Sequence, residues 1–194
     1  MVDIQTIKQF RESTGVGMVE AKNVLDEAGG DIAKATDILR SRGVKAASKK
    51  ADRTTGEGFI GSYIHSTGKV GALVEVLCET DFVARTDDFH ALARDLAMHV
   101  AASNPLYKAV EDVPAEVIEK EREIYKQQLV EEKKPEAIVE KIIDGKLNKF
   151  FDDACLLRQK FIKDEELTIE QLIQNAIQKI GEKIQVGKFV RFHI

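Results

Sequence analysis

The amino-acid sequence predicts an α+β protein in which an N-terminal three-helix module precedes a core of helices packed on a three-stranded antiparallel sheet. Apolar residues recur at helical spacing over residues 4–43. They alternate with other residues over 56–79 and again near the C-terminus, which is typical of strands, and helical spacing returns between these segments. Strands separated by helices favour an α+β core.

Three short helices are expected within a first domain at 1–43. The apolar residues on one face of each are Ile4, Ile7 and Phe10; Met18, Ala21, Val24, Leu25 and Ala28; and Ile32, Ala35, Ile38 and Leu39. Asp31 is suited to cap the third helix, and Gly43 is expected to end it. Residues 44–55 carry four cations and one acid, which indicates a basic linker or a solvated helical extension, with no site of its own.

The α+β core is assigned to 56–194. Alternation in GFIGSYIHSTGKVGALVEVLCET predicts two strands joined by a turn at 66–69, where Gly68 supplies the permissive backbone. A helix is expected over 87–102, and Asn104, which precedes a proline, is expected to stop it.

Two further helices are predicted to begin at Pro114 and Pro135, because a proline in the first turn costs no hydrogen bond. Gly145 is expected to break or bend the second of them. The chain then closes with a helix over 168–180 and a strand within KIQVGKFVRFHI.

Several segments, in order along the chain, resemble one family. FRESTGVGMVEAKNVL, CETDFVAR, GKLNKFFDDACLLRQKFIKD and GKFVRF resemble motifs of the elongation factor Ts family, the guanine-nucleotide exchange factors of the translational GTPase elongation factor Tu. Residues 1–43 also resemble the ubiquitin-associated type of three-helix domain. The family usually has two adjacent methionines where this chain has Met18 and Val19, a conservative departure.

The resemblance implies a cytoplasmic elongation factor of protein biosynthesis that binds elongation factor Tu with GDP. It would promote GDP release by disturbing the Mg²⁺ and phosphate site, so that GTP can rebind. The implied partner-binding residues are a tip that would enter the GTPase near its Mg²⁺, formed by Thr80, Asp81, Phe82 and Val83, and a contact on its nucleotide-binding domain, formed by Val16, Met18 and Val19.

The residues themselves leave alternatives open. A Phe just after a strand more often packs into its own core than into a partner, so the local pattern alone favours a buried Phe82. Met18 is equally well explained as helix core. The three-helix module also hosts several binding functions, so a dimeric protein-binding adaptor is the competing hypothesis.

Self-association is predicted from the length of the chain. Longer family members carry a second core half and a protruding helical hairpin, and 194 residues are too few for both. A single three-stranded half leaves an apolar sheet edge or face uncovered, which a homodimer would cover.

The sequence gives little support to other classes of protein. A net charge of -4 disfavours nucleic-acid binding, and no apolar run approaches the roughly 20 residues that span a bilayer. His65, His90, His99 and His193 lack metal-ligand spacing. TGVGMVEAK follows no predicted strand and lacks the Gly-Lys-Ser/Thr ending of a phosphate loop. We therefore expect no enzyme, no cofactor, no metal and no direct nucleotide binding. Cys78 and Cys155 are expected to be buried free thiols.

Overall fold

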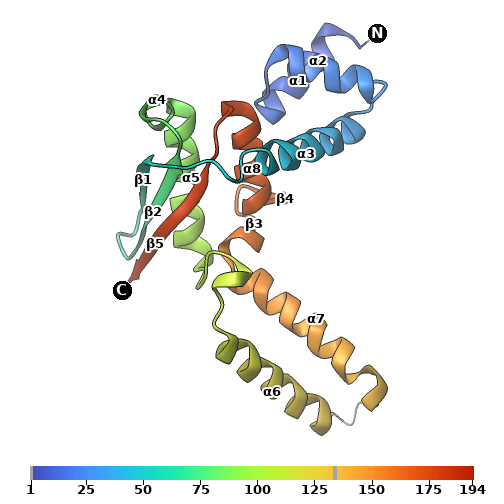
Figure 1. Cartoon of the computed structure of the whole chain (residues 1–194), viewed down its shortest axis with the longest axis vertical. Coiled ribbons are helices and arrows are strands. Elements are labelled where there is room, and N and C mark those ends of the chain that lie inside the picture. Colours follow the sequence, from blue (N-terminus) through green and yellow to red (C-terminus); the bar gives the residue numbers. More distant parts are fainter. Residues whose placement is uncertain (1, 133–134) are drawn as a thin grey trace.

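The computed structural model describes residues 2–132 and 135–194, and it divides into three regions along its long axis (Figure 1). A three-helix unit holds the N-terminus, a sheet with its helices forms the middle, and a pair of long helices protrudes at the opposite end. The α+β class and the three-stranded antiparallel sheet are confirmed.

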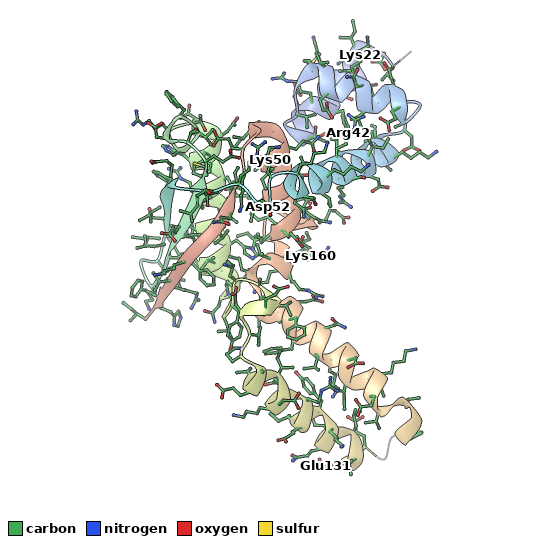
Figure 2. The ribbon with its side chains drawn as sticks, in the orientation of Figure 1. Lys22, Arg42, Lys50, Asp52, Glu131 and Lys160 are labelled. Carbon is green, nitrogen blue, oxygen red and sulfur yellow. The ribbon has the colours of Figure 1, made fainter. Side chains whose placement is uncertain are left out.

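The three-helix unit consists of α1 (Ile4–Thr14), α2 (Met18–Glu27) and α3 (Ile32–Ser48). Its buried cluster contains residues of all three helices: Ile7, Phe10, Ala21, Val24, Leu25, Ala28, Ala35 and Leu39. The side chains of Asp3 and Asp31 cap α1 and α3 by accepting backbone N–H groups. Arg42, labelled in Figure 2, reaches from α3 to Glu20 on α2 with an N–O distance of 2.6 Å. The three predicted helices are therefore present.

The expectation that Gly43 ends the third helix is wrong, because α3 continues to Ser48. Gly43 is buried against α8 (Ile169–Ile180), and a Cβ at this position would lie 3.4 Å from side-chain oxygens of Asn175 and Gln178. The glycine thus allows two helices to approach closely rather than terminating one of them. As a result, α3 belongs both to the three-helix unit and to the core.

The sheet has the strand order β1-β2-β5, formed by β1 (Glu57–Ile64), β2 (Val70–Cys78) and β5 (Gln185–His193). The predicted turn joins β1 to β2, and Gly68 within it has φ 68°. One face of the sheet packs on α5 (Asp87–Ser103), and the inward side chains of β2 are fully buried there: Ala72, Val74, Val76 and Cys78. As predicted, α5 stops at Asn104, which precedes a proline and adopts the left-handed conformation with φ 48°.

The remaining elements are short pieces and the protruding pair. The short pieces are α4 (Asp81–Ala84), η1 (Val110–Asp112), η2 (Leu156–Arg158), β3 (Lys160–Phe161) and β4 (Asp164–Thr168). The protruding pair is α6 (Ala115–Glu131) and α7 (Glu136–Ala154). The β3-β4 hairpin was not predicted, since its strands are too short and too charged to show an alternation.

The helix pair is present where two helices were predicted, with two differences of detail. Pro114 and Pro135 stand at the N-caps, one position before the first turns in which they were predicted. In addition, Gly145 does not break α7, which is a continuous helix through that position. The pair has an apolar cluster of its own, separate from the sheet core, in which Leu129, Ile143 and Leu147 are buried.

A buried histidine lies at the root of the helix pair. His99 of α5 is 0% exposed, and its Nε2 donates to the side-chain oxygen of Gln159 at 2.9 Å. Gln159 in turn donates to the backbone carbonyl of Asp153 at 2.6 Å, which fixes the orientation of its amide. Nδ1 of His99 has no hydrogen-bond partner among the described residues, and burial lowers the pKa of this imidazole below 6.5. His99 is therefore held neutral.

This arrangement predicts a loss of stability at mildly acidic pH. The folded state disfavours the protonated imidazole, whereas the unfolded chain takes up a proton near pH 6.5, so the stabilisation is full above that value and declines as the pH falls below it. We expect the melting temperature at about pH 5.5 to be lower than at about pH 7.5. The His99→Gln variant should show a flatter dependence in this window, with His65→Gln at an exposed site as control. An unchanged slope in His99→Gln would contradict the assignment.

Both cysteines are buried free thiols, as predicted. Burial is the largest cause that raises the pKa of each thiol. Cys78 also donates to the backbone carbonyl of Thr80 at 3.2 Å. Low reactivity of both thiols is expected from this environment.

Candidate functional site

An exposed apolar tip follows the central strand of the sheet. The chain leaves β2 at Cys78 and forms the single helical turn α4, whose N-cap is Thr80. The Phe82 side chain is 80% exposed on this turn, although the core of the protein lies directly behind it. The local pattern, which favoured a buried Phe82, is therefore overruled by the structure.

The other residues of the tip attach it to the core. Val83 is half-buried and packs against the sheet cluster, and Ala84 is buried. His90 of α5 donates from Nε2 to the backbone carbonyl of Ala84 at 2.9 Å, and its ring stacks on Phe59 of β1. Asp81 is paired with Arg85 at 2.9 Å on the solvent side. The four predicted residues are thus contiguous, but they have different environments.

Two loops exchange hydrogen bonds at the base of the tip. The carboxylate of Glu182, in the loop between α8 and β5, accepts from the backbone N–H groups of Glu79 and Thr80, each at 3.1 Å, and from the Thr80 hydroxyl at 2.7 Å. Glu79 returns the contact by accepting from the backbone N–H of Lys183 at 2.6 Å. We call these four residues, Glu79, Thr80, Glu182 and Lys183, the clasp. Sequence reasoning missed it, because its halves are about a hundred residues apart and no local pattern marks either one.

The segment between α3 and β1 is attached to the clasp. Arg53 pairs with Glu79 at 3.2 Å, and the Lys183 ammonium donates to the backbone carbonyls of Ala51 and Arg53 at 2.6 and 2.9 Å. The bond from the Lys183 amide, and next to it Arg53, hold the pKa of Glu79 below 4.5. Figure 2 labels Lys50 and Asp52 in this segment. The basic stretch is therefore bound to the core through Arg53, not simply solvated.

The second set of predicted partner-binding residues lies at the start of α2. Met18 and Val19 are 41% and 75% exposed, whereas Val16 is half-buried and packs on the three-helix cluster. The alternative in which Met18 is helix core is excluded by this exposure. Figure 1 places the α1-α2 region and α4 at the same end of the molecule, away from the α6-α7 pair.

The sheet face turned away from α5 is apolar and uncovered. Strand register places Ser62, Leu73 and Val190 in one row across it, and Ile64, Gly71 and Phe192 in the next. Six large apolar residues on this face are exposed: Ile60, Ile64, Leu73, Val190, Phe192 and, at the chain end, Ile194. We call this surface the open sheet face. It is the uncovered apolar face that the sequence predicted for a single three-stranded half.

The two most prominent cavities among the described residues do not combine a histidine or cysteine with an acid. These cavities, of about 730 and 740 Å³, are lined by neither histidine nor cysteine. Among the described residues, no group of three or more His, Cys, Asp and Glu side chains could hold a metal ion. None of the helices described there is long and apolar enough to cross a membrane.

The fold and the site define a protein that presents exposed apolar surfaces on an α+β frame. Comparison with known proteins identifies its family. The family model "Elongation factor TS" matches residues 35–194. The chain is 55% identical over 194 residues to an elongation factor Ts of Thermosipho melanesiensis, covering 100% of this chain and 99% of that relative. It is also 55% identical over 193 residues to one of Fervidobacterium nodosum, covering 100% and 98%, respectively.

A third relative, an elongation factor Ts of Carboxydothermus hydrogenoformans, is 52% identical over 194 residues, covering 100% of this chain and 89% of the relative. The chain therefore belongs to the elongation factor Ts family, a family of translation elongation factors. The resemblance found in the sequence motifs is confirmed over the whole chain.

Proposed function

We propose that this protein binds elongation factor Tu with GDP in the cytoplasm and promotes GDP release, after which GTP rebinds and displaces it. The observation that carries the proposal is the exposure of Phe82 on a tip whose backbone is anchored on both sides. An apolar side chain of this size, 80% exposed on an anchored turn, is suited to enter a cleft of a partner. The protein would act by binding to the GTPase and disturbing its nucleotide site, without catalytic chemistry, cofactor or nucleotide binding of its own.

In this mechanism Phe82 is an apolar wedge between elements of the GTPase that support its bound Mg²⁺. GTPases hold GDP through a phosphate-cradling loop and Mg²⁺, so disturbing either loosens the nucleotide. Asp81, which is half-exposed beside Phe82 and paired with Arg85, would perturb the polar groups around the metal. Val83 and Thr80 would keep the turn in place, since one packs on the core and the other caps α4.

The size of the effect requires more than the wedge. Burying one Phe side chain contributes roughly 1.5 to 3 kcal/mol, and each 1.4 kcal/mol corresponds to a tenfold change in an equilibrium constant. Coupling is reciprocal, so the factor by which the protein weakens GDP binding is the factor by which GDP weakens binding of the protein. The rest of the free energy that weakens GDP binding must come from a wider interface.

We propose that the three-helix unit supplies part of that interface. It would be a ubiquitin-associated-like domain that rests on the nucleotide-binding domain of the GTPase through Val16, Met18 and Val19. The exposure of Met18 and Val19 supports this role, while the half-buried Val16 would shape the turn before α2. On this view the 56–194 core carries the tip and the dimer contact.

The test is release of a fluorescent GDP from purified elongation factor Tu, with and without the protein. Acceleration that rises with protein concentration and saturates would support the proposal. Binding to the GTPase without acceleration would instead favour an adaptor, and the absence of both would overturn the assignment of the partner.

We also propose that the protein is a homodimer that buries the open sheet face. Contiguous apolar surface of this kind is typical of interfaces, and a two-fold axis would place the same face of each copy against the other. Longer relatives would need no such contact if a second core half covered the face.

Replacing Phe192 with Asp should convert the dimer to a monomer, because each interface would then bury two charged groups in apolar surroundings. Light scattering after size exclusion gives the mass, and circular dichroism checks the fold. Val130→Asp is a matched control, since Val130 is 68% exposed on α6 and Phe192 is 64% exposed on the sheet. A wild-type protein that is monomeric at micromolar concentration, or a dimer in Phe192→Asp, would refute the proposal.

A further inference from the structure

The clasp is one of two attachments of the tip, the other being the His90 contact with Ala84, and it acts through Glu182 on a distant loop. The carboxylate of Glu182 receives three hydrogen bonds from Glu79 and Thr80, two from backbone amides and one from the Thr80 hydroxyl. Glu182 is half-buried beneath α4, whereas Phe82 projects into solvent. Because both oxygens of one carboxylate accept these three bonds, they are of the charge-assisted kind and are strongly directional.

The contact determines which way the Thr80 hydroxyl points. That hydroxyl donates its proton to Glu182 at 2.7 Å, which leaves its lone pairs to accept the Val83 amide at 3.4 Å as the N-cap of α4. The second bond is long, and an isolated helical turn is unstable in water without external contacts. His90 and the packing of Val83 and Ala84 hold the end of α4, and Glu182 holds its N-cap. The direction of the Phe82 side chain therefore depends in part on Glu182.

We propose that Glu182 is a positioning residue for nucleotide release: it fixes the direction in which Phe82 leaves the surface and does not itself touch the GTPase. The inference rests on the proposed exchange function. It adds to that function a residue on the α8-β5 loop, outside the tip itself, that promotes GDP release.

The decisive experiment is a double-mutant cycle on stimulated GDP release, with Glu182→Ala, Phe82→Ala and the combination. Glu182→Ala removes all three bonds, and it should lower the maximal rate of GDP release at saturating protein by about tenfold, because water can replace part of what the carboxylate accepted. In the Phe82→Ala background the same change should have less than about a twofold effect, because the side chain whose direction it sets is missing. Glu182→Gln, which retains one accepting oxygen, should fall between wild type and Glu182→Ala.

A purely structural role gives a different pattern. It would lower the rate by the same factor in both backgrounds, or would shift only the half-saturating concentration, and either result overturns the positioning role. Glu165→Ala, at an exposed glutamate of β4, is the matched control and should leave the rate unchanged.

A measurement on the free protein separates this inference from the proposed function. Hydrogen–deuterium exchange of the amides of Thr80 and Val83 should speed up in Glu182→Ala, while the amides of α5 stay protected. If the tip amides of Glu182→Ala exchange as slowly as those of wild type, the inference is overturned, even if wild type accelerates GDP release from elongation factor Tu. If wild type does not accelerate GDP release from elongation factor Tu, the proposed function fails. The role of Glu182 in nucleotide release then fails with it, whatever exchange rates the tip amides show.

Discussion

Replacing Phe82 with Ala is expected to reduce stimulated GDP release by one to two orders of magnitude and to leave the melting temperature within about 2 °C of wild type. The side chain is 80% exposed, so its removal opens no cavity in the free protein. In the proposed complex the same ring is buried, and losing roughly 1.5 to 3 kcal/mol of apolar burial corresponds to a rate loss of about 10- to 150-fold. The measurement is the fluorescent-GDP release rate at saturating protein, together with a thermal melt.

The contradicting outcomes for Phe82 are distinct. A variant that releases GDP at the wild-type rate would show that the wedge is unnecessary. A variant that melts far below wild type would show that Phe82 supports the fold in solution. Phe82→Leu, which keeps most of the apolar volume, should retain a larger part of the rate than Phe82→Ala.

Replacing Phe89 with Ala should have the opposite signature. Phe89 lies in the first turn of α5 and is fully buried in the sheet cluster, among the largest fully buried side chains of the described residues. Truncating a buried Phe destabilises a protein by about 3–5 kcal/mol. For a chain of this length that lowers the melting temperature by about 6–20 °C. Circular dichroism melts at neutral pH measure the change.

The comparison of Phe82 and Phe89 controls for the chemistry of the substitution, since the two residues are seven positions apart and lose the same atoms. Below its melting transition, Phe89→Ala should retain most of the release rate, because the tip is held by the clasp and by His90. If Phe89→Ala melts within a few degrees of wild type, the packing of α5 on the sheet is not as described.

The sequence pattern was sufficient to predict the elements whose boundaries are determined by their own residues. The alternating strands, the turn at Gly68 and the helix ending at Asn104 are all where local rules place them. The errors occur at glycines. Gly43 was expected to end a helix and Gly145 to break or bend one, yet α3 and α7 continue through these positions. For Gly43 the deciding fact is the approach of α8, which is more than a hundred residues away in the chain and invisible to a local rule.

The candidate site shows the same division. Thr80 as a helix cap agrees with its residue type, but the exposure of Phe82 contradicts the local expectation and agrees with the family motif. Glu182 had no signal at all, because a single glutamate after a helix-ending glycine is typical of any solvated loop. Its importance comes only from the fold, which brings it to the base of the tip.

The continuity of α3 has a thermodynamic consequence for recognition. Its 17 residues extend about 25 Å from the three-helix unit to the face of α8, and the helix continues through residues 44–48, where the sequence left a linker or a helical extension open. A partner that touches both Val19 and Phe82 would meet two anchors at a preset spacing. A flexible linker would lose conformational entropy on association, whereas here that entropy is lost earlier, when the chain folds. Once one anchor is bound, the second therefore binds at a high effective concentration.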